Sequence, residues 1–426
     1  MFSYDYLLDL AMILLFTKLL GMFTRRLRMP QVVGALLAGV VLGPSVLNIL
    51  HDVSFLKKTA ELGVVVLMFN AGLNTDIDEM KNAGKASLIV AVIGVLVPLA
   101  GGFGIASLFN IGAVEQAGSS VFLQNMFIGV ILTATSVSIT VETLRELGKL
   151  SSPVGSAILG AALIDDIIGI IALTVIASTA DSDVHLLVTL LKVVLFFVFV
   201  AGAGFIFYKL FVYFNKRNNR DLRRYVVISF AFCLLMAFSA EHFFGVADIT
   251  GAFFAGLIIS HTERTKYLAN RFSTLSYILL SPIFFASLGL SVDLSSGFSG
   301  SILLFAFALL LTAVITKVIG CGIGARISGY SSRESLQIGV GMMTRGEVAL
   351  IIAQKGAALG LLSTAFFGPI ILMVIATAVL TPIVLKLVFN EPGHGSGRKL
   401  TSMLHRKKAL STGDSENPGC EITSQG

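Results

Sequence analysis

The stretch "ALIDDIIGIIAL", residues 162–173, places two adjacent aspartates inside a segment that is otherwise almost entirely apolar. If this segment crosses a bilayer, an ionised Asp165 or Asp166 near its middle costs about 2.5–3.5 kcal/mol. Three further charged residues also interrupt apolar runs: Lys317, Arg345 and Glu347. Charged side chains at such positions indicate a functional site, and each of them needs a compensating partner.

The whole chain is far more apolar than a soluble domain. Of its 426 residues, 55% are hydrophobic and 13% are charged, and the mean hydropathy is +0.88. Soluble domains carry about 25% charged residues. The composition therefore predicts an all-α integral membrane protein whose partner is the lipid bilayer. The net charge of +6 is typical of basic cytoplasmic loops, so no nucleic acid is expected.

Apolar runs separated by charged or Gly/Pro/Asn breaks predict about 13 transmembrane helices. Their approximate bounds are 4–24, 30–50, 58–73, 85–109, 121–146, 152–178, 184–214, 221–243, 246–261, 268–290, 298–327, 334–358 and 363–389. Residues 1–390 thus form a transmembrane domain, and residues 391–426 a short polar tail that is predicted to be disordered. The first run is interpreted as a retained span rather than a signal peptide. Basic residues concentrate after odd-numbered runs, which predicts an N-terminus outside and a C-terminus in the cytoplasm.

Two apolar runs, seven spans apart, contain polar interruptions: "ILTATSVSIT" (131–140) and "VGMMTRGEVAL" (340–350). An offset of seven spans reverses orientation, so the pattern predicts inverted repeats with two crossing discontinuous helices. Continuous helices whose Ser and Thr hydroxyls bond back to the backbone are the alternative. The candidate crossing-helix residues are Thr133, Thr135, Ser136, Arg345 and Glu347. The last two are expected to act through structure and electrostatics before ion binding.

Asp165 and Asp166 point about 100° apart on a helix, so they cannot face the same point. Lys317, midway along the run 298–327, is the expected partner of Asp165, while Asp166 is expected to face a cavity. A static salt bridge that fixes packing is the alternative, but it leaves the second aspartate without explanation. Burial favours the neutral form of a carboxyl group, and a carboxylate can bind a hard cation. We therefore predict that H⁺ and a metal cation compete at Asp166 and Asp165.

Taken together, seven segments resemble the bacterial monovalent cation:proton antiporter family. The resemblance is to sodium/proton antiporters of the NapA and GerN type, with the KefC-type potassium efflux systems as cousins, and it covers nearly all of residues 1–390. The segments are "RMPQVVGALLAGVVLGPSVLN" (28–48), "ELGVVVLMFNAGL" (61–73), "LTATSVSITVETLRELG" (132–148), "LGAALIDDIIGIIAL" (159–173), "ITGAFFAGLIIS" (249–260), "SPIFFASLGLSVDL" (281–294) and "GVGMMTRGEVALIIAQKG" (339–356).

The resemblance implies a core domain that moves against a dimerisation domain, and hence a homodimer. It also implies that Asp166 is the principal ion ligand, that Asp165 pairs with Lys317, and that Thr135 lies on the unwound part of the first crossing helix. The adjacent aspartates match the electrogenic branch of the family. One departure is Asn70, which stands where the family pattern has an apolar residue.

The function expected from these features is a secondary active antiporter that exchanges Na⁺, or Li⁺ or K⁺, for H⁺ in the inner (cytoplasmic) membrane. No cofactor is expected beyond the transported ions. The main alternative is a K⁺/H⁺ efflux system without a nucleotide-binding domain. The segment "GCGIGA" (320–325) is weakly similar to a dinucleotide-binding motif, but it lies inside an apolar run and therefore does not indicate nucleotide binding. A passive channel would conduct without proton coupling. An enzyme is not expected, because an aspartyl protease needs its two carboxylates on different helices.

Overall fold

The chain folds into helices joined by short turns, with no β-strand among the residues that the structure describes. The structure is a computed structural model. It describes residues 4–27, 29–44, 46–50, 53–75, 77–109, 120–180, 186–217, 222–262, 264–290, 300–358, 361–362 and 366–390. The predicted tail, residues 391–426, lies outside the described residues.

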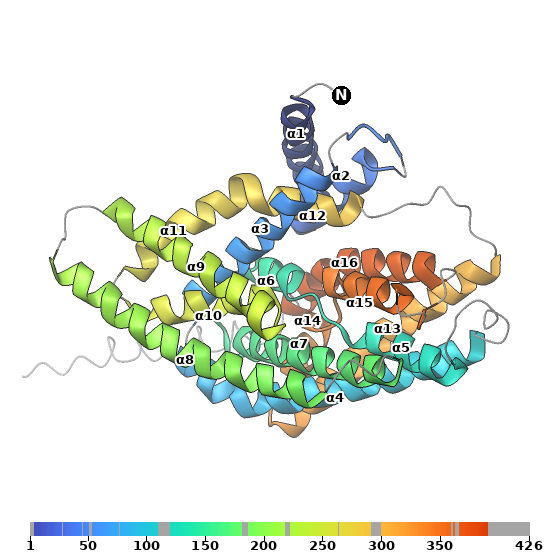
Figure 1. Ribbon diagram of the computed structural model, residues 1–426. Helices are drawn as coiled ribbons and strands as arrows, with labels where there is room; N and C mark the ends of the chain where they lie inside the picture. The colour runs from blue at the N-terminus through green and yellow to red at the C-terminus, as the bar shows by residue number, and fades with distance from the viewer. Residues whose placement is uncertain are drawn as a thin grey trace, which may run out of the picture. The chain divides into compact units, whose positions relative to one another are not determined.

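Each of the thirteen predicted runs contains helix (Figure 1). In chain order the helices are α1 (Asp5–Arg26), α2 (Gln31–Leu42), α3 (Val53–Leu73), α4 (Ile77–Phe109), α5 (Val121–Thr133), α6 (Val137–Glu146), α7 (Pro153–Ala180), α8 (Leu186–Arg217), α9 (Leu222–Phe244), α10 (Asp248–Ser260), α11 (Thr265–Leu275), the π-helix η2 (Ser276–Leu280), α12 (Ser281–Leu290), α13 (Gly300–Ile327), α14 (Ser332–Gly341), α15 (Glu347–Ala358) and α16 (Phe367–Asn390).

The predicted integral membrane fold is confirmed. Nine helical segments of the described chain are long and apolar enough to cross a bilayer. Two shorter apolar helices, α2 and α10, add to them, whereas α3 and the broken pair α14–α15 do not meet the same criterion. The total of thirteen crossings therefore stays a prediction.

Several predicted bounds differ from the structure, among them the start of α4, which begins at Ile77 rather than near residue 85. The helix α2 ends at Leu42 rather than near residue 50, because Gly43 and Pro44 follow it. The helix α3 begins at Val53, earlier than predicted, so it includes charged residues at its start. The predicted run 268–290 contains the π-helix η2, which directly precedes the turn that holds Pro282. Proline has no N–H for the i→i−4 bond, so the regular hydrogen-bond pattern changes there.

Packing divides the described helices into two groups. In the first group, α4 packs against α5, α7 and α13, and α14 packs against α13 and α7. In the second group, α3 packs against α10, α11 and α12, and α2 packs against α1 and α12. In Figure 1, α1, α2 and α12 lie at the top of the view, and α4, α5 and α7 lie in its lower part. The helix α6 contacts α7 in the first group and α2 and α3 in the second.

Glycines let the helices of the second group approach closely. A Cβ atom on Gly72 of α3 would lie 2.2 Å from the carbonyl oxygen of Phe253, and one on Gly256 of α10 would lie 2.2 Å from that of Phe69. Small residues at such contacts are typical of membrane helices, whose association depends on close packing rather than on a hydrophobic driving force. This contact fixes α3 firmly against α10.

Candidate functional site

The predicted polar interruptions are true breaks in two helices. The helix α5 ends at Thr133, and Ala134 and Ser136 have extended ψ angles of 133° and 103° before α6 begins at Val137. The helix α14 ends at Gly341, and residues 343–346 are not helical. All of residues 127–141 and 337–346 are buried. Irregular backbone at membrane depth is tolerated where protein surrounds it, and this condition is met here.

The two breaks touch each other. The N–H of Ser136 donates to the carbonyl oxygen of Thr344 at 3.0 Å, and the Thr140 hydroxyl donates to the carbonyl oxygen of Gly341 at 2.7 Å. The hydroxyls of Thr140 and Thr344 lie 3.0 Å apart. A Cβ atom on Gly346 would lie 2.5 Å from Ser136 Oγ, so the crossing needs a glycine. Thr140 and Thr344 were not among the predicted site residues, although both lie inside the two quoted interruptions.

Side chains compensate the carbonyl groups that these breaks leave exposed. A helix C-terminus has unsatisfied carbonyls and a partial negative charge, which a nearby cation stabilises. At the end of α5, Lys317 Nζ donates to the carbonyl oxygen of Thr133 at 2.8 Å. At the end of α14, the Thr140 hydroxyl fills the same role through Gly341. Lys317 thus stabilises both the end of α5 at the crossing and the carboxylate of Asp165.

Asp165 is held by two partners. Lys317 Nζ lies 2.9 Å from Asp165 Oδ1 and 3.1 Å from Oδ2, and the Thr135 hydroxyl donates to Oδ2 at 2.7 Å. Lys317 is 0% exposed and Asp165 is 2% exposed. Removing either member of such a buried pair leaves an uncompensated charge. The structure therefore brings together Asp165 of α7, Lys317 of α13, Thr133 at the end of α5 and Thr135 in the break that follows it.

Asp166 follows Asp165 on α7 and is also buried, with 7% of its surface exposed. Because its side chain leaves the helix about 100° away from that of Asp165, it faces a different side of α7. Its role as an ion ligand and the cavity expected beside it stay predictions. Ser136 lies at the crossing, where its hydroxyl is 3.2 Å from that of Ser138.

Arg345 lies in the second break and is fully buried. Its N–H donates to the Thr377 hydroxyl of α16 at 3.1 Å, and its Nη2 donates to the carbonyl oxygen of Ala313 at 3.4 Å. Glu347 is the first residue of α15, and its side chain lies outside the described residues, so its predicted electrostatic role stays a prediction. Thr377 was not predicted, and the only sequence signal for it is a hydroxyl within an apolar run.

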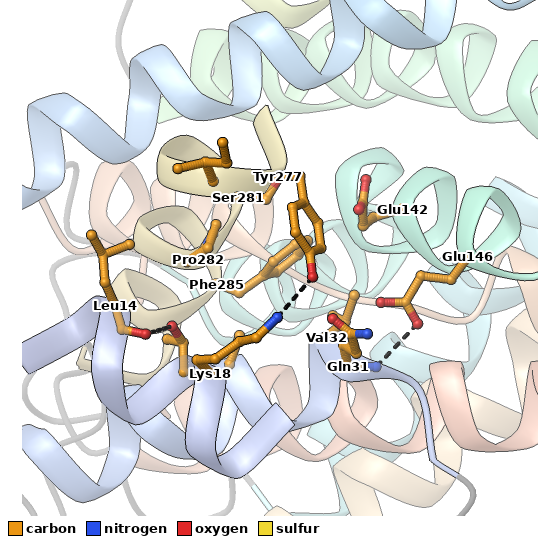
Figure 2. A pocket seen from close by; sticks show the side chains of 13 residues that line it. Leu14, Lys18, Gln31, Val32, Glu142, Glu146, Tyr277, Ser281, Pro282 and Phe285 are labelled. Carbon is orange, nitrogen blue, oxygen red and sulfur yellow. Dashed lines mark hydrogen bonds between the residues drawn. The ribbon is translucent and has the colours of Figure 1, made fainter. Parts of the chain in front are cut away.

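A cavity of about 270 Å³ lies beside α6 (Figure 2). Its walls come from α1, α2, α6, η2 and α12, and they include Glu142 and Glu146. Among the bonds at its wall, Lys18 Nζ donates to the Tyr277 hydroxyl at 2.9 Å, and the N–H of Gln31 donates to Glu146 Oε2 at 3.0 Å (Figure 2). The cavity thus lies between part of α6 and helices of the second group, which α6 also contacts directly.

Broken helices that cross at membrane depth, beside a buried carboxylate and amine, define a secondary transporter fold. The chain belongs to the sodium/hydrogen exchanger family, whose transmembrane region matches residues 11–391. The family resemblance inferred from the sequence is therefore confirmed, and the chain is a multi-pass membrane protein of a transporter family.

Individual relatives cover most of the chain. The Na(+)/H(+)-K(+) antiporter GerN of Bacillus cereus is 38% identical over 400 residues, which are 91% of this chain and 97% of the relative. The Na(+)/H(+) antiporter of Enterococcus hirae is 35% identical over 384 residues, 88% of this chain and 96% of the relative. The sodium proton antiporter MjNhaP1 of Methanocaldococcus jannaschii has a similar fold, with a TM-score of 0.68 over 98% of this chain and 100% of the other at 16% identity.

Proposed function

We propose that this protein is a secondary active antiporter that exchanges Na⁺ for H⁺ by alternating access. The family and the names of the relatives support this function. The observation that carries the proposal is the buried Asp165–Lys317 pair next to Asp166 and beside the crossing of two broken helices. In this arrangement a buried carboxylate is compensated by a cation, a proton or an amine at every stage.

Competition at Asp166 provides the coupling. A deprotonated carboxylate binds Na⁺, and protonation releases it, so the two ions cannot share the site. Asp165 contributes through its ion pair with Lys317. When Asp165 gains a proton or Lys317 loses one, the ion pair breaks and the two side chains separate. The second proton makes the exchange electrogenic, with more protons than cations moved in each cycle.

The proposal includes a plasma-membrane location, an N-terminus outside and a C-terminus in the cytoplasm. It also includes a homodimer in which a core domain moves against a dimerisation domain around the midplane site. The transported cation is cargo, and no resident cofactor, nucleic acid or catalysed reaction is part of the proposal. The distribution of basic residues supports the orientation.

K⁺/H⁺ exchange is the second candidate. One observation favours testing it: the Bacillus cereus relative is named for K⁺ as well as Na⁺. The name describes the relative and not this protein, so transport of Na⁺, Li⁺ and K⁺ by this protein has to be compared directly.

The test is transport by the full chain in proteoliposomes that contain a pH-sensitive dye. We expect Na⁺ to dissipate a pH gradient, and a clamped membrane potential to change the initial rate. Asp166→Asn is expected to reduce the signal to that of empty liposomes, because the substitution removes the titrating charge. Asp78→Asn is the matched control, because the Asp78 side chain is 91% exposed. Full transport by D166N would refute the site assignment, and preference for K⁺ over Na⁺ would favour the second candidate.

A further inference from the structure

Asn70 is a polar residue in the apolar stretch "LMFNAGL" (67–73) of α3, and it is 0% exposed. The structure supplies its partner. With its amide oxygen turned to the guanidinium group of Arg145, Asn70 Oδ1 accepts from Nη1 at 3.0 Å and from Nη2 at 3.1 Å. In this orientation its Nδ2 also donates to the carbonyl oxygen of Ala269 on α11 at 3.3 Å. A buried amide is thus satisfied by two other helices.

Arg145 makes two further contacts. Its Nη2 donates to the Ser273 hydroxyl of α11, and its Nη1 lies 3.4 Å from Glu142 Oε2 on its own helix. Planar, bidentate recognition is a property of arginine that lysine lacks. Asn70, Arg145 and Ser273 therefore form a polar cluster that joins α6 to α3 and α11. We call it the α6 clamp.

The clamp lies where movement between the helix groups has to occur. Arg145 is about 12 Å along α6 from Val137, where the first break ends. The same end of α6 is joined to α2 by the bond from the Gln31 N–H to Glu146 Oε2. Nearby, the Ser151 hydroxyl donates to the carbonyl oxygen of Asn74, at the end of α3, at 3.0 Å. Any rigid-body motion of the crossing helices against α3 and α11 changes these contacts.

We propose that Asn70 and Arg145 are positioning residues that set the balance between the two access states of the exchanger. The clamp stabilises the conformation described here, and it is absent or altered when the site opens to the other side of the membrane. This inference rests on the proposed antiport. It goes beyond it by assigning the conformational balance to residues that contact neither Asp165 nor Asp166 through any described hydrogen bond.

A change in this balance has a distinctive signature. Apparent affinity at each membrane face depends on the fraction of protein in the state that opens to that face. A variant that loosens the clamp therefore raises the apparent Na⁺ affinity at one face and lowers it at the other. A purely structural defect lowers activity without this opposite shift.

The experiment measures the KM for Na⁺ separately at each face, in proteoliposomes containing the full chain in one orientation. Asn70→Leu and Ser273→Ala remove partners of Arg145, and Arg145→Lys removes the bidentate geometry. Each is expected to shift the two KM values in opposite directions, by up to roughly tenfold for loss of a charge-assisted bond. Asn70→Asp, which gives Arg145 a charged partner, is expected to shift both values the other way.

Thr274→Val is the matched control. Thr274 neighbours Ser273 on α11, but its hydroxyl bonds to the carbonyl oxygen of Asn270 on the same helix, so both KM values should stay unchanged. Hydrogen–deuterium exchange provides a readout that needs no transport. We expect S273A and N70L to increase exchange in residues 140–148 and 266–273, and T274V to leave it unchanged.

Several results would overturn the clamp. One is an equal KM shift at both faces for N70L and S273A. Another is a KM shift of the same sign for N70D and N70L. A third is unchanged hydrogen–deuterium exchange in α6 for both N70L and S273A. If N70L does not fold, S273A alone decides the question. A failure of the proposed antiport is distinguishable, because the wild-type protein would then show no Na⁺-dependent proton movement, while the exchange result would still decide the clamp.

Discussion

At the scale of single residues, the ion pair shows how a buried acid is accommodated far from water. Asp165 accepts hydrogen bonds from the amine of Lys317 and the hydroxyl of Thr135. Lys317 in turn uses its remaining capacity on the carbonyl oxygen of Thr133. Each of these bonds satisfies a buried polar group of both partners, so the four residues act as one unit rather than as independent contacts.

The pair predicts a non-additive effect on stability. Lys317→Gln and Asp165→Asn each leave one buried charge without its partner, at a cost of about 3–5 kcal/mol. The double variant removes both charges, and we expect it to be more stable than either single variant. The measurement is the midpoint of thermal unfolding in detergent, followed by size-exclusion chromatography of heated samples. Additive losses in the double variant would show that the two side chains contribute independently.

The sequence predicted single site residues best where the residue type is rare in apolar runs. Only a few charged residues interrupt apolar runs, so Lys317, midway along its run, could be named as the expected partner of Asp165. Hydroxyl groups are far more numerous. The polar interruption marked Thr135 as a candidate, but no sequence pattern shows that its hydroxyl reaches Asp165, whereas the Thr174 hydroxyl bonds to its own helix. Asn70 was noticed as a departure, but its partner Arg145 is 75 residues away and could not be inferred.

At the scale of elements, the two broken helices depend on very close approach. The first break has only small side chains, from Ala134 to Ser136, and Gly346 of the second break lies directly against Ser136. A methyl group at this position would overlap Ser136, so the two segments would have to separate. Since Lys317 and Thr135 bond from this region to Asp165, the separation would also disturb the ion pair.

Gly346→Ala is therefore expected to destabilise the protein by about 1–3 kcal/mol, as overpacking usually does, and to reduce transport strongly. The measurement is thermal stability together with Na⁺-driven proton movement. The control is Gly104→Ala on α4, where an added Cβ has no atom within 4 Å. Combining G346A with Ser136→Gly removes the overlapping atoms and should restore part of the stability. Equal behaviour of G346A and G104A would contradict the close crossing.

At the scale of the whole molecule, orientation in the membrane is open to direct measurement. With the N-terminus outside, chain ends created after residues 217 and 390 lie in the cytoplasm, and an end created after residue 245 lies outside. Green fluorescent protein exported unfolded to the outside does not become fluorescent. We therefore expect bright fusions at 217 and 390 and a dark fusion at 245. The reverse pattern would invert the proposed topology.

Hydropathy alone was sufficient to predict the membrane class, the approximate helix positions and the two interruptions. These features are local, because each depends on whether a short run of residues prefers lipid, and on a local loss of regular helix. The charged residues in the apolar runs indicated the candidate site, because a charged side chain inside a membrane span is costly and therefore marks a functional position.

The folded chain decided which groups meet. Residues 135, 165 and 317 are joined in one network, and so are residues 70, 145 and 273, although the members of each set come from three segments far apart in the chain. Such contacts depend on the angle and depth at which helices pack, which are set by glycines and side-chain shape across the whole bundle. The sequence shows which polar and charged side chains are buried at a cost in free energy, but only the packing of the helices in three dimensions selects their partners.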